Sequence, residues 1–112
     1  MALKNADLSV HKSSGNVFAD LGLKGADEKF TKLRLAVTLN NIIAQRKLPQ
    51  ATAAKRLGVN QPKISALKNY RLAGFSVERL MTFLTALDFD VDIVIRTKSD
   101  RKKPGRVSVI AA

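Results

Sequence analysis

The chain lacks cysteine and tryptophan altogether and has only one histidine and one tyrosine among its 112 residues. Without cysteine it can form no disulfide framework, which fits a reducing compartment. His11 has no second histidine to join it, so the sequence supports neither a metal site nor a Ser-His-Asp arrangement. Paired carboxylates, a phosphate-binding loop and a nucleophile–base set are also missing. We therefore expect no enzymatic activity, no metal and no cofactor.

Long apolar runs are missing too. No run approaches the length of a membrane span, and the first residues, MALKNADLSVHKSS, lack the apolar region of a signal peptide. The sequence therefore predicts a soluble, cytoplasmic protein without a membrane partner. Its length is enough for one small domain with a single core, and a hydrophobic content of 46% is ordinary for a globular protein.

Acidic residues are absent from Lys29 to Val77, within a chain of formal net charge +11. The basic residues of this stretch after Lys29 are Lys32, Arg34, Arg46, Lys47, Lys55, Arg56, Lys63, Lys68 and Arg71. Solvated surfaces usually mix both signs, so a surface of one sign suits a polyanion, and nucleic acid is the strongest candidate. A membrane surface would favour a basic amphipathic helix edged with bulky aromatics, and we find none.

The stretch 50–69, QATAAKRLGVNQPKISALKN, has the pattern of two short helices around a turn. Ala54 is small enough for a close helix crossing, and Gly58 suits a turn that needs a positive φ. Asn60 is a good N-cap, and Pro62 falls in the first helical turn, where a missing N–H does no harm. These features predict a helix-turn-helix that enters the DNA major groove, with a purely structural helical hairpin as the alternative.

A long helix is predicted before the motif, from Ala26 to about Lys47, and another after it, from Ser76 as N-cap to Leu87. The first helix has two apolar faces. We expect one of them to face the core of the domain: Phe30, Leu33, Val37 and Ala44. The other face consists of Leu35, Leu39 and Ile42. It would need to be covered by a further element, either the N-terminal arm or another chain.

Asp90 to Arg96 alternates apolar and polar residues and is rich in β-branched side chains, which predicts a strand with Val91, Ile93 and Ile95 on one face. A lone strand needs a partner, either Arg106–Ile110 or the same strand of a second copy. We favour the second copy, because a two-fold dimer matches a palindromic DNA site. The chain then divides into a flexible arm (1–25), a DNA-binding domain with the dimerisation strand (26–97) and a basic tail (98–112).

At Gln50, Ala54, Gly58 and Gln61 the chain resembles the lambda-repressor-like (XRE) helix-turn-helix family. A narrower resemblance, over residues 14–98, is to the HigA-type antitoxins of bacterial toxin–antitoxin pairs. It is carried by SGNVFADLGL, LGVNQPKISAL and GFSVERLMTFLTALDFDVDIVI. Two positions depart from the family pattern: Lys63 stands where an acidic residue is frequent, and Pro49 stands where threonine is usual. The resemblance implies a mainly α, lambda-repressor-like domain, and the strand is expected to pair across a dimer.

The resemblance also implies which residues contact DNA. The second motif helix would lie in the major groove, with base-reading residues Gln61, Pro62, Lys63, Ser65 and Ala66. Glutamine can pair with adenine and lysine with guanine. Phosphate contacts would come from Lys47, Gln50, Lys68, Asn69 and Arg71. For Lys63 and Lys68, the alternative is an ordinary solvated helix surface.

We therefore expect a homodimeric, sequence-specific repressor of a palindromic double-stranded operator. The resemblance alone adds that it is an antitoxin, which autoregulates its operon and neutralises a RelE-like toxin. The arm, with its apolar residues Val17, Phe18, Leu21 and Leu23, is the candidate toxin-holding segment, and the alternative is that it packs on its own domain. One alternative is a stand-alone XRE or phage-type regulator without a toxin. Another is an RNA-binding or protein-interaction module, although the shortage of aromatic side chains disfavours single-stranded RNA.

Overall fold

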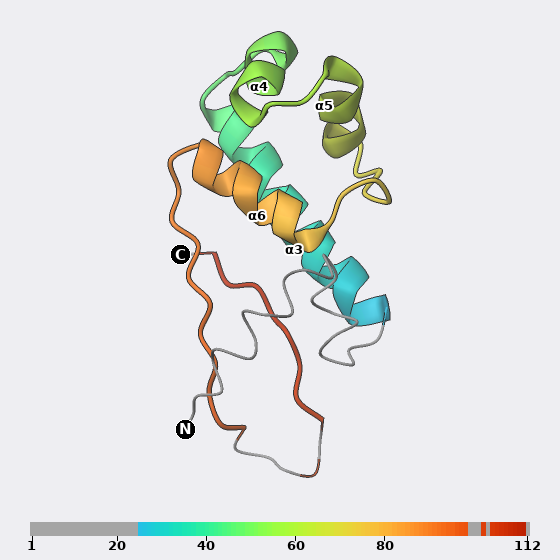
Figure 1. Cartoon of the computed structure of the whole chain (residues 1–112), viewed down its shortest axis with the longest axis vertical. Helices are drawn as coiled ribbons and strands as arrows, with labels where there is room; N and C mark the ends of the chain where they lie inside the picture. Colours follow the sequence, from blue (N-terminus) through green and yellow to red (C-terminus); the bar gives the residue numbers. More distant parts are fainter. Residues whose placement is uncertain (1–24, 99–101, 103, 112) are drawn as a thin grey trace.

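The computed structural model describes residues 25–98, 102 and 104–111. Its helices are α3 (Gly25–Gln45), α4 (Gln50–Leu57), α5 (Gln61–Lys68) and α6 (Val77–Ala86). In Figure 1, α6 lies along the long helix α3, and α4 and α5 lie above α6, with α4 near the end of α3. The described part is thus mainly α, as predicted, and α3 and α6 begin and end within two residues of their expected limits.

The starts of α5 and α6 are fixed by the predicted caps. The Asn60 side chain accepts a hydrogen bond from the Lys63 backbone N–H at 3.0 Å, and the Ser76 hydroxyl accepts one from the Arg79 N–H at 3.0 Å. At the start of α4, Pro49 is the N-cap residue and makes no side-chain cap hydrogen bond. The side-chain caps of α5 and α6 each satisfy a backbone donor that has no partner within its own helix.

The helices end in one common geometry, in which the residue after the last turn is left-handed. These residues are Lys47 (φ 53°), Gly58 (φ 70°), Tyr70 (φ 57°) and Asp88 (φ 70°). After α4, for example, the Val59 N–H donates to the Ala54 carbonyl at 3.0 Å, and the Gly58 N–H donates to the Lys55 carbonyl at 3.3 Å. This is a Schellman ending, which glycine adopts most easily. The Gly58 turn was predicted, whereas the other endings use residues for which the left-handed conformation is less favourable.

The core lies where α3, α5 and α6 meet. Its fully buried large side chains are Leu39 of α3, Leu67 of α5, Leu80 of α6 and Leu87, which caps α6. Phe75, just before α6, packs edge-on against Phe83, with ring centroids 6.0 Å apart. Burying one leucine side chain stabilises a fold by about 1.5–3 kcal/mol. Leu67 therefore fixes the helix predicted to read DNA onto the rest of the domain.

The prediction for the two apolar faces of α3 was wrong, because the faces are exchanged. The face expected to need a second cover is the buried one: Leu35, Leu39 and Ile42. The face expected in the core is exposed, with Phe30 at 57%, Leu33 at 41% and Val37 at 38% exposure, and Ala44 is exposed as well. Both sets have helical spacing, so periodicity alone cannot tell which one α5 and α6 cover.

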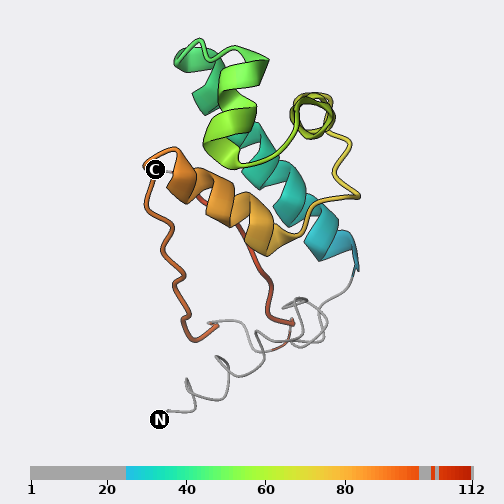
Figure 2. The same ribbon diagram turned by 45° about the horizontal axis from the view of Figure 1, so that its top comes forward.

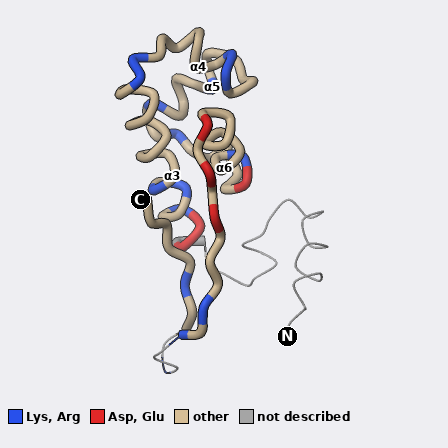
Figure 3. Tube along the Cα trace, turned by 90° about the vertical axis from the view of Figure 1, so that its left-hand side faces the viewer, with Lys and Arg blue, Asp and Glu red and all other residues tan. Residues whose placement is uncertain are grey.

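The segment predicted as a strand, residues 90–96, is extended but forms no strand in the described part of the chain. Ile93 and Ile95 are 74% and 77% exposed, whereas Val91 packs partly against the core. Residues 104–111 return in the opposite direction (Figure 3). No backbone hydrogen bond joins the two segments among the described residues. A strand needs such bonds, so pairing with 106–110 is not seen within one chain.

The returning segment is instead held on the helices. The Arg34 guanidinium donates to the Val109 carbonyl at 3.2 Å, and Val107 and Val109 pack against the core. No helix of the described residues is both long and apolar enough to span a bilayer. The predicted arm lies outside the described residues apart from Gly25, and so do its apolar residues Val17, Phe18, Leu21 and Leu23.

Candidate nucleic-acid interface

The two motif helices pack against each other and expose one face of α5. Ala53, Ala54 and Leu57 are buried in α4, and Ile64 and Leu67 are buried in α5. The Asn40 side-chain amide of α3 donates to the Leu67 carbonyl at 3.0 Å. This bond holds the last turn of α5 on α3. The orientation of α5 is therefore set by buried apolar side chains together with one bond from a neighbouring helix. Figure 2 shows α5 nearly end-on beside α3.

The predicted base-reading residues lie on the first two turns of α5. Gln61 and Pro62 are exposed, and Lys63, Ser65 and Ala66 are half-buried. The Gln61 carboxamide has no hydrogen bond to other described residues, so both its donor and its acceptor are free for a ligand. The backbone geometry of this turn is fixed by the Asn60 cap. A short rigid turn thus presents a free amide at the outer end of the helix.

Lys63 differs from its neighbours, because its ammonium is already engaged. Its Nζ donates to the Gly74 carbonyl at 2.9 Å and lies 4.6 Å from the centroid of the Phe75 ring. The side chain therefore ties α5 to the loop that leads into α6. Sequence reasoning missed this contact, since nothing in the spacing of Lys63, Gly74 and Phe75 indicates it.

Three of the five predicted phosphate contacts come together. Lys47, Gln50 and Lys68 line one cavity of about 180 Å³ between the end of α3, the start of α4 and α5. Asn69 lies outside it, with its amide donating to the Ser65 carbonyl at 2.9 Å. Arg71 is exposed in the loop after α5. Three of these residues thus share one site, and the other two follow Lys68 just after the end of α5.

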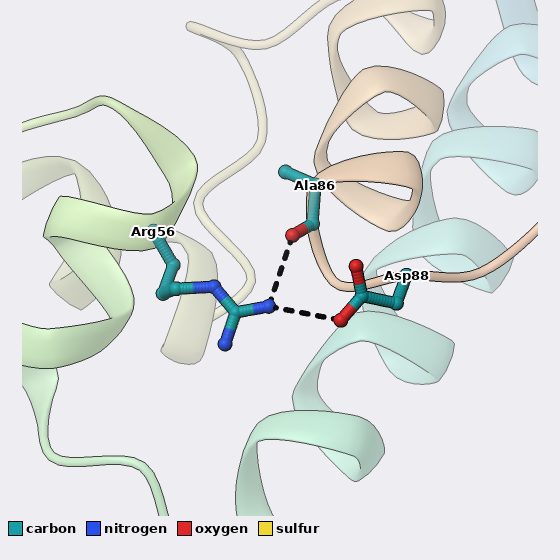
Figure 4. A network of polar contacts seen from close by, with 3 residues as sticks. All are labelled: Arg56, Ala86 and Asp88. Atoms are coloured by element: carbon teal, nitrogen blue, oxygen red, sulfur yellow. Dashed lines mark hydrogen bonds and ion pairs between the residues drawn. The ribbon is translucent and has the colours of Figure 1, made fainter.

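The motif helices themselves carry charge of one sign. No acidic residue occurs between Lys29 and Val77, and Figure 3 shows basic residues over α4 and α5, with acidic residues confined to other segments. One basic residue of α4 is partly neutralised. Arg56 donates to the Ala86 carbonyl at 3.1 Å and to the Asp88 carboxylate at 3.3 Å (Figure 4). This exposed ion pair contributes at most about 1 kcal/mol, but it joins α4 to the end of α6.

Comparisons with known proteins agree with this geometry. A family model described as a helix-turn-helix domain matches residues 17–96. A solved structure described as an XRE family transcriptional regulator is 61% identical, with a TM-score of 0.76. The match covers 80% of this chain and 100% of that one. No protein of curated function matches. Most of the chain is covered by both matches, and the chain belongs to the XRE family of helix-turn-helix transcriptional regulators.

Proposed function

We propose that this protein is a sequence-specific repressor that binds a palindromic double-stranded operator as a homodimer. The observation that supports it best is the acid-free stretch from Lys29 to Val77, which includes all of α4 and α5, together with the exposed face of α5. A surface of one sign attracts the DNA backbone, and an exposed helix face fits the major groove.

Base reading is assigned to Gln61, Pro62, Lys63, Ser65 and Ala66. Gln61 is supported by its exposure and its free carboxamide, which can pair bidentately with adenine. The Lys63 ammonium donates one of its three N–H groups to the Gly74 carbonyl at 2.9 Å. We propose that Lys63 exchanges this contact for a base when DNA binds.

Phosphate contacts are assigned to Lys47, Gln50, Lys68, Asn69 and Arg71. Lys47, Lys68 and Arg71 make no ion pair with other described residues, so their charge is available to a polyanion. Phosphate contacts from these residues would set the register of α5 in the groove without reading sequence.

The homodimer is assigned to the segment with Val91, Ile93 and Ile95. Two observations support it: Ile93 and Ile95 are strongly exposed, and the extended backbone has no ladder partner among the described residues. Pairing with the same segment of a second copy would bury these isoleucines and supply the missing backbone hydrogen bonds. It would also relate two copies of α5 by a two-fold axis, which a palindromic operator requires.

The finer assignment is an antitoxin that neutralises a RelE-like toxin and represses its own operon. An antitoxin needs a protein-binding surface separate from α5. The exposed side of α3, with Phe30, Leu33 and Val37, is an apolar stripe directly after residues 1–24. We expect deletion of residues 1–25 to abolish toxin neutralisation and to leave DNA binding intact. A truncated chain that still protects cells from the toxin would refute the assignment.

A stand-alone regulator is the second candidate. It is favoured by the 61% identical relative, which is described only as a transcriptional regulator. Co-purification from the native host separates the two, since an antitoxin would bring a small nuclease-like protein with it.

Salt dependence tests the DNA-binding proposal itself. With roughly five to ten phosphate contacts per dimer, the logarithm of the binding constant should fall against the logarithm of salt concentration with a slope of about −0.9 per contact. Titration of a duplex pool at several salt concentrations measures this slope. A flat dependence would remove the electrostatic basis of the proposal.

A further inference from the structure

The cavity between α3, α4 and α5 combines an apolar floor with a cationic rim. Its floor includes Ile43, Leu48 and Ile64, of which Ile64 is buried in the core. Its rim carries Lys47, Gln50 and Lys68, all exposed. An apolar floor that fixes a ligand's body, with a few polar groups that fix its orientation, is the usual construction of a small-molecule site.

The rim charges have no ion-pair partner among the described residues. Neither Lys47 nor Lys68 makes an ion pair or a side-chain hydrogen bond with another described residue, and neither does the Gln50 carboxamide. The position of Lys47 is fixed, because its left-handed backbone is closed by a hydrogen bond from its N–H to the Ala44 carbonyl at 3.1 Å. Two unpaired ammonium groups beside an apolar floor suit a carboxylate that carries an apolar group.

The size of the cavity limits that apolar group. Its volume is about 180 Å³, and an engineered apolar cavity of about 150 Å³ binds benzene. We propose that this cavity binds a small amphipathic monoanion, a carboxylate with an apolar group about the size of a benzene ring, and that its occupancy displaces DNA. The apolar group would lie on Ile43 and Ile64, with the carboxylate between Lys47 and Lys68.

The displacement of DNA rests on the proposed function, because Lys47, Gln50 and Lys68 are three of its assigned phosphate contacts. A bound carboxylate would occupy the same ammonium groups, so the two ligands would compete. By mass action, a competitor at ten times its own dissociation constant weakens binding about tenfold for each shared site. The protein would thus release its operator in response to a small anionic metabolite.

Methyl NMR on the full chain tests binding without DNA. Sodium benzoate is the probe, at constant ionic strength maintained with sodium chloride. The δ1 methyl signals of Ile43 and Ile64 should shift and saturate, with a dissociation constant on the order of 1 mM. Those of Ile93, Ile95 and Ile110, which are exposed outside the cavity, should remain in place. Benzyl alcohol, the neutral counterpart, should bind at least about tenfold more weakly if a charge–charge contact is lost.

Charge variants locate the site. The double variant Lys47→Gln with Lys68→Gln should weaken benzoate binding by about tenfold or more, because it removes both ammonium groups. The matched control is Lys29→Gln with Lys55→Gln, which removes two exposed charges outside the cavity and should leave benzoate affinity unchanged. Shifts that do not saturate, or equal losses in the two double variants, would overturn the site.

Two further measurements separate binding in the cavity from its effect on DNA: a titration with inorganic phosphate, and duplex affinity in the presence of benzoate. If inorganic phosphate shifted Ile43 and Ile64 and benzoate did not, the cavity would bind only a backbone phosphate and the amphipathic-anion site would be refuted. Benzoate that saturates the site but leaves duplex affinity unchanged at constant ionic strength would refute the displacement. Saturable benzoate binding by a protein that binds no duplex at any salt concentration would uphold the site and refute the proposed function.

Discussion

The contact between Lys63 and the loop before α6 gives a sharp test of the proposal that α5 reads DNA through Lys63. The Lys63 ammonium donates to the Gly74 carbonyl at 2.9 Å and lies over the Phe75 ring at 4.6 Å. A charge-assisted hydrogen bond at a half-exposed site contributes about 1 kcal/mol, and an exposed cation–π contact about 0.5 kcal/mol. The change Lys63→Met keeps the aliphatic stem and removes the ammonium. It should therefore lower the free energy of unfolding by about 1.5 kcal/mol.

A second change removes the same contact from the other side. A Cβ at position 74 would lie 2.9 Å from the Lys63 Nζ, so Gly74→Ala should push the ammonium off the carbonyl. Because both changes break one interaction, their costs should not add, and the double variant should be no less stable than Lys63→Met alone. Denaturant unfolding of the wild type, the two single variants and the double variant measures these free energies. Gly105→Ala, where a Cβ meets nothing within 4 Å, and Lys55→Met serve as matched controls.

DNA affinity then distinguishes a base-reading Lys63 from a purely structural one. If the ammonium leaves Gly74 to pair with guanine, Gly74→Ala removes a cost of binding and should tighten operator binding by up to about tenfold. Lys63→Met should weaken operator binding by about 1–3 kcal/mol and relax base preference at one position per half-site. Both changes can be measured by fluorescence anisotropy on an operator and on a duplex altered at that position. Equal weakening by both, or additive unfolding costs, would refute the exchange of contacts.

Four further substitutions test other parts of the molecule. Gly58→Ala should cost about 1–2 kcal/mol of unfolding free energy, because φ is 70° there and a Cβ would meet no neighbour within 4 Å, so only backbone strain contributes; a fully stable variant would contradict this. Ile93→Asp should convert the proposed dimer to monomer in light scattering and abolish operator binding, since a charge would enter the segment proposed to pair; a dimeric variant with normal affinity would exclude that interface. Gln61→Ala should change affinity at one base position per half-site by about 1–3 kcal/mol, whereas Arg71→Ala should weaken all duplexes alike. A uniform loss in both variants would contradict the separate roles.

The features that the sequence determined by itself are local. Asn60 and Ser76 cap their helices through bonds that span three residues, and Gly58 ends α4 in the left-handed conformation. Such features depend on residues within one helical turn, so spacing and residue type are sufficient to predict them. The acid-free stretch from Lys29 to Val77 is likewise a property of composition. The helix-turn-helix and its cationic character therefore follow from the chain without any knowledge of packing.

Tertiary structure decided what depends on residues far apart in the chain. Both apolar faces of α3 have helical spacing, and only the packing of its neighbours buries Leu35 and Leu39 while leaving Phe30 exposed. Lys63 meets Gly74 eleven residues later, and the cavity brings together side chains from three helices. The segment 90–96 alternates like a strand, yet alternation supplies no hydrogen-bond partner, and none is present among the described residues. Periodicity fixes which side chains share a face, whereas the neighbours that cover that face are fixed only by the packing of the whole fold.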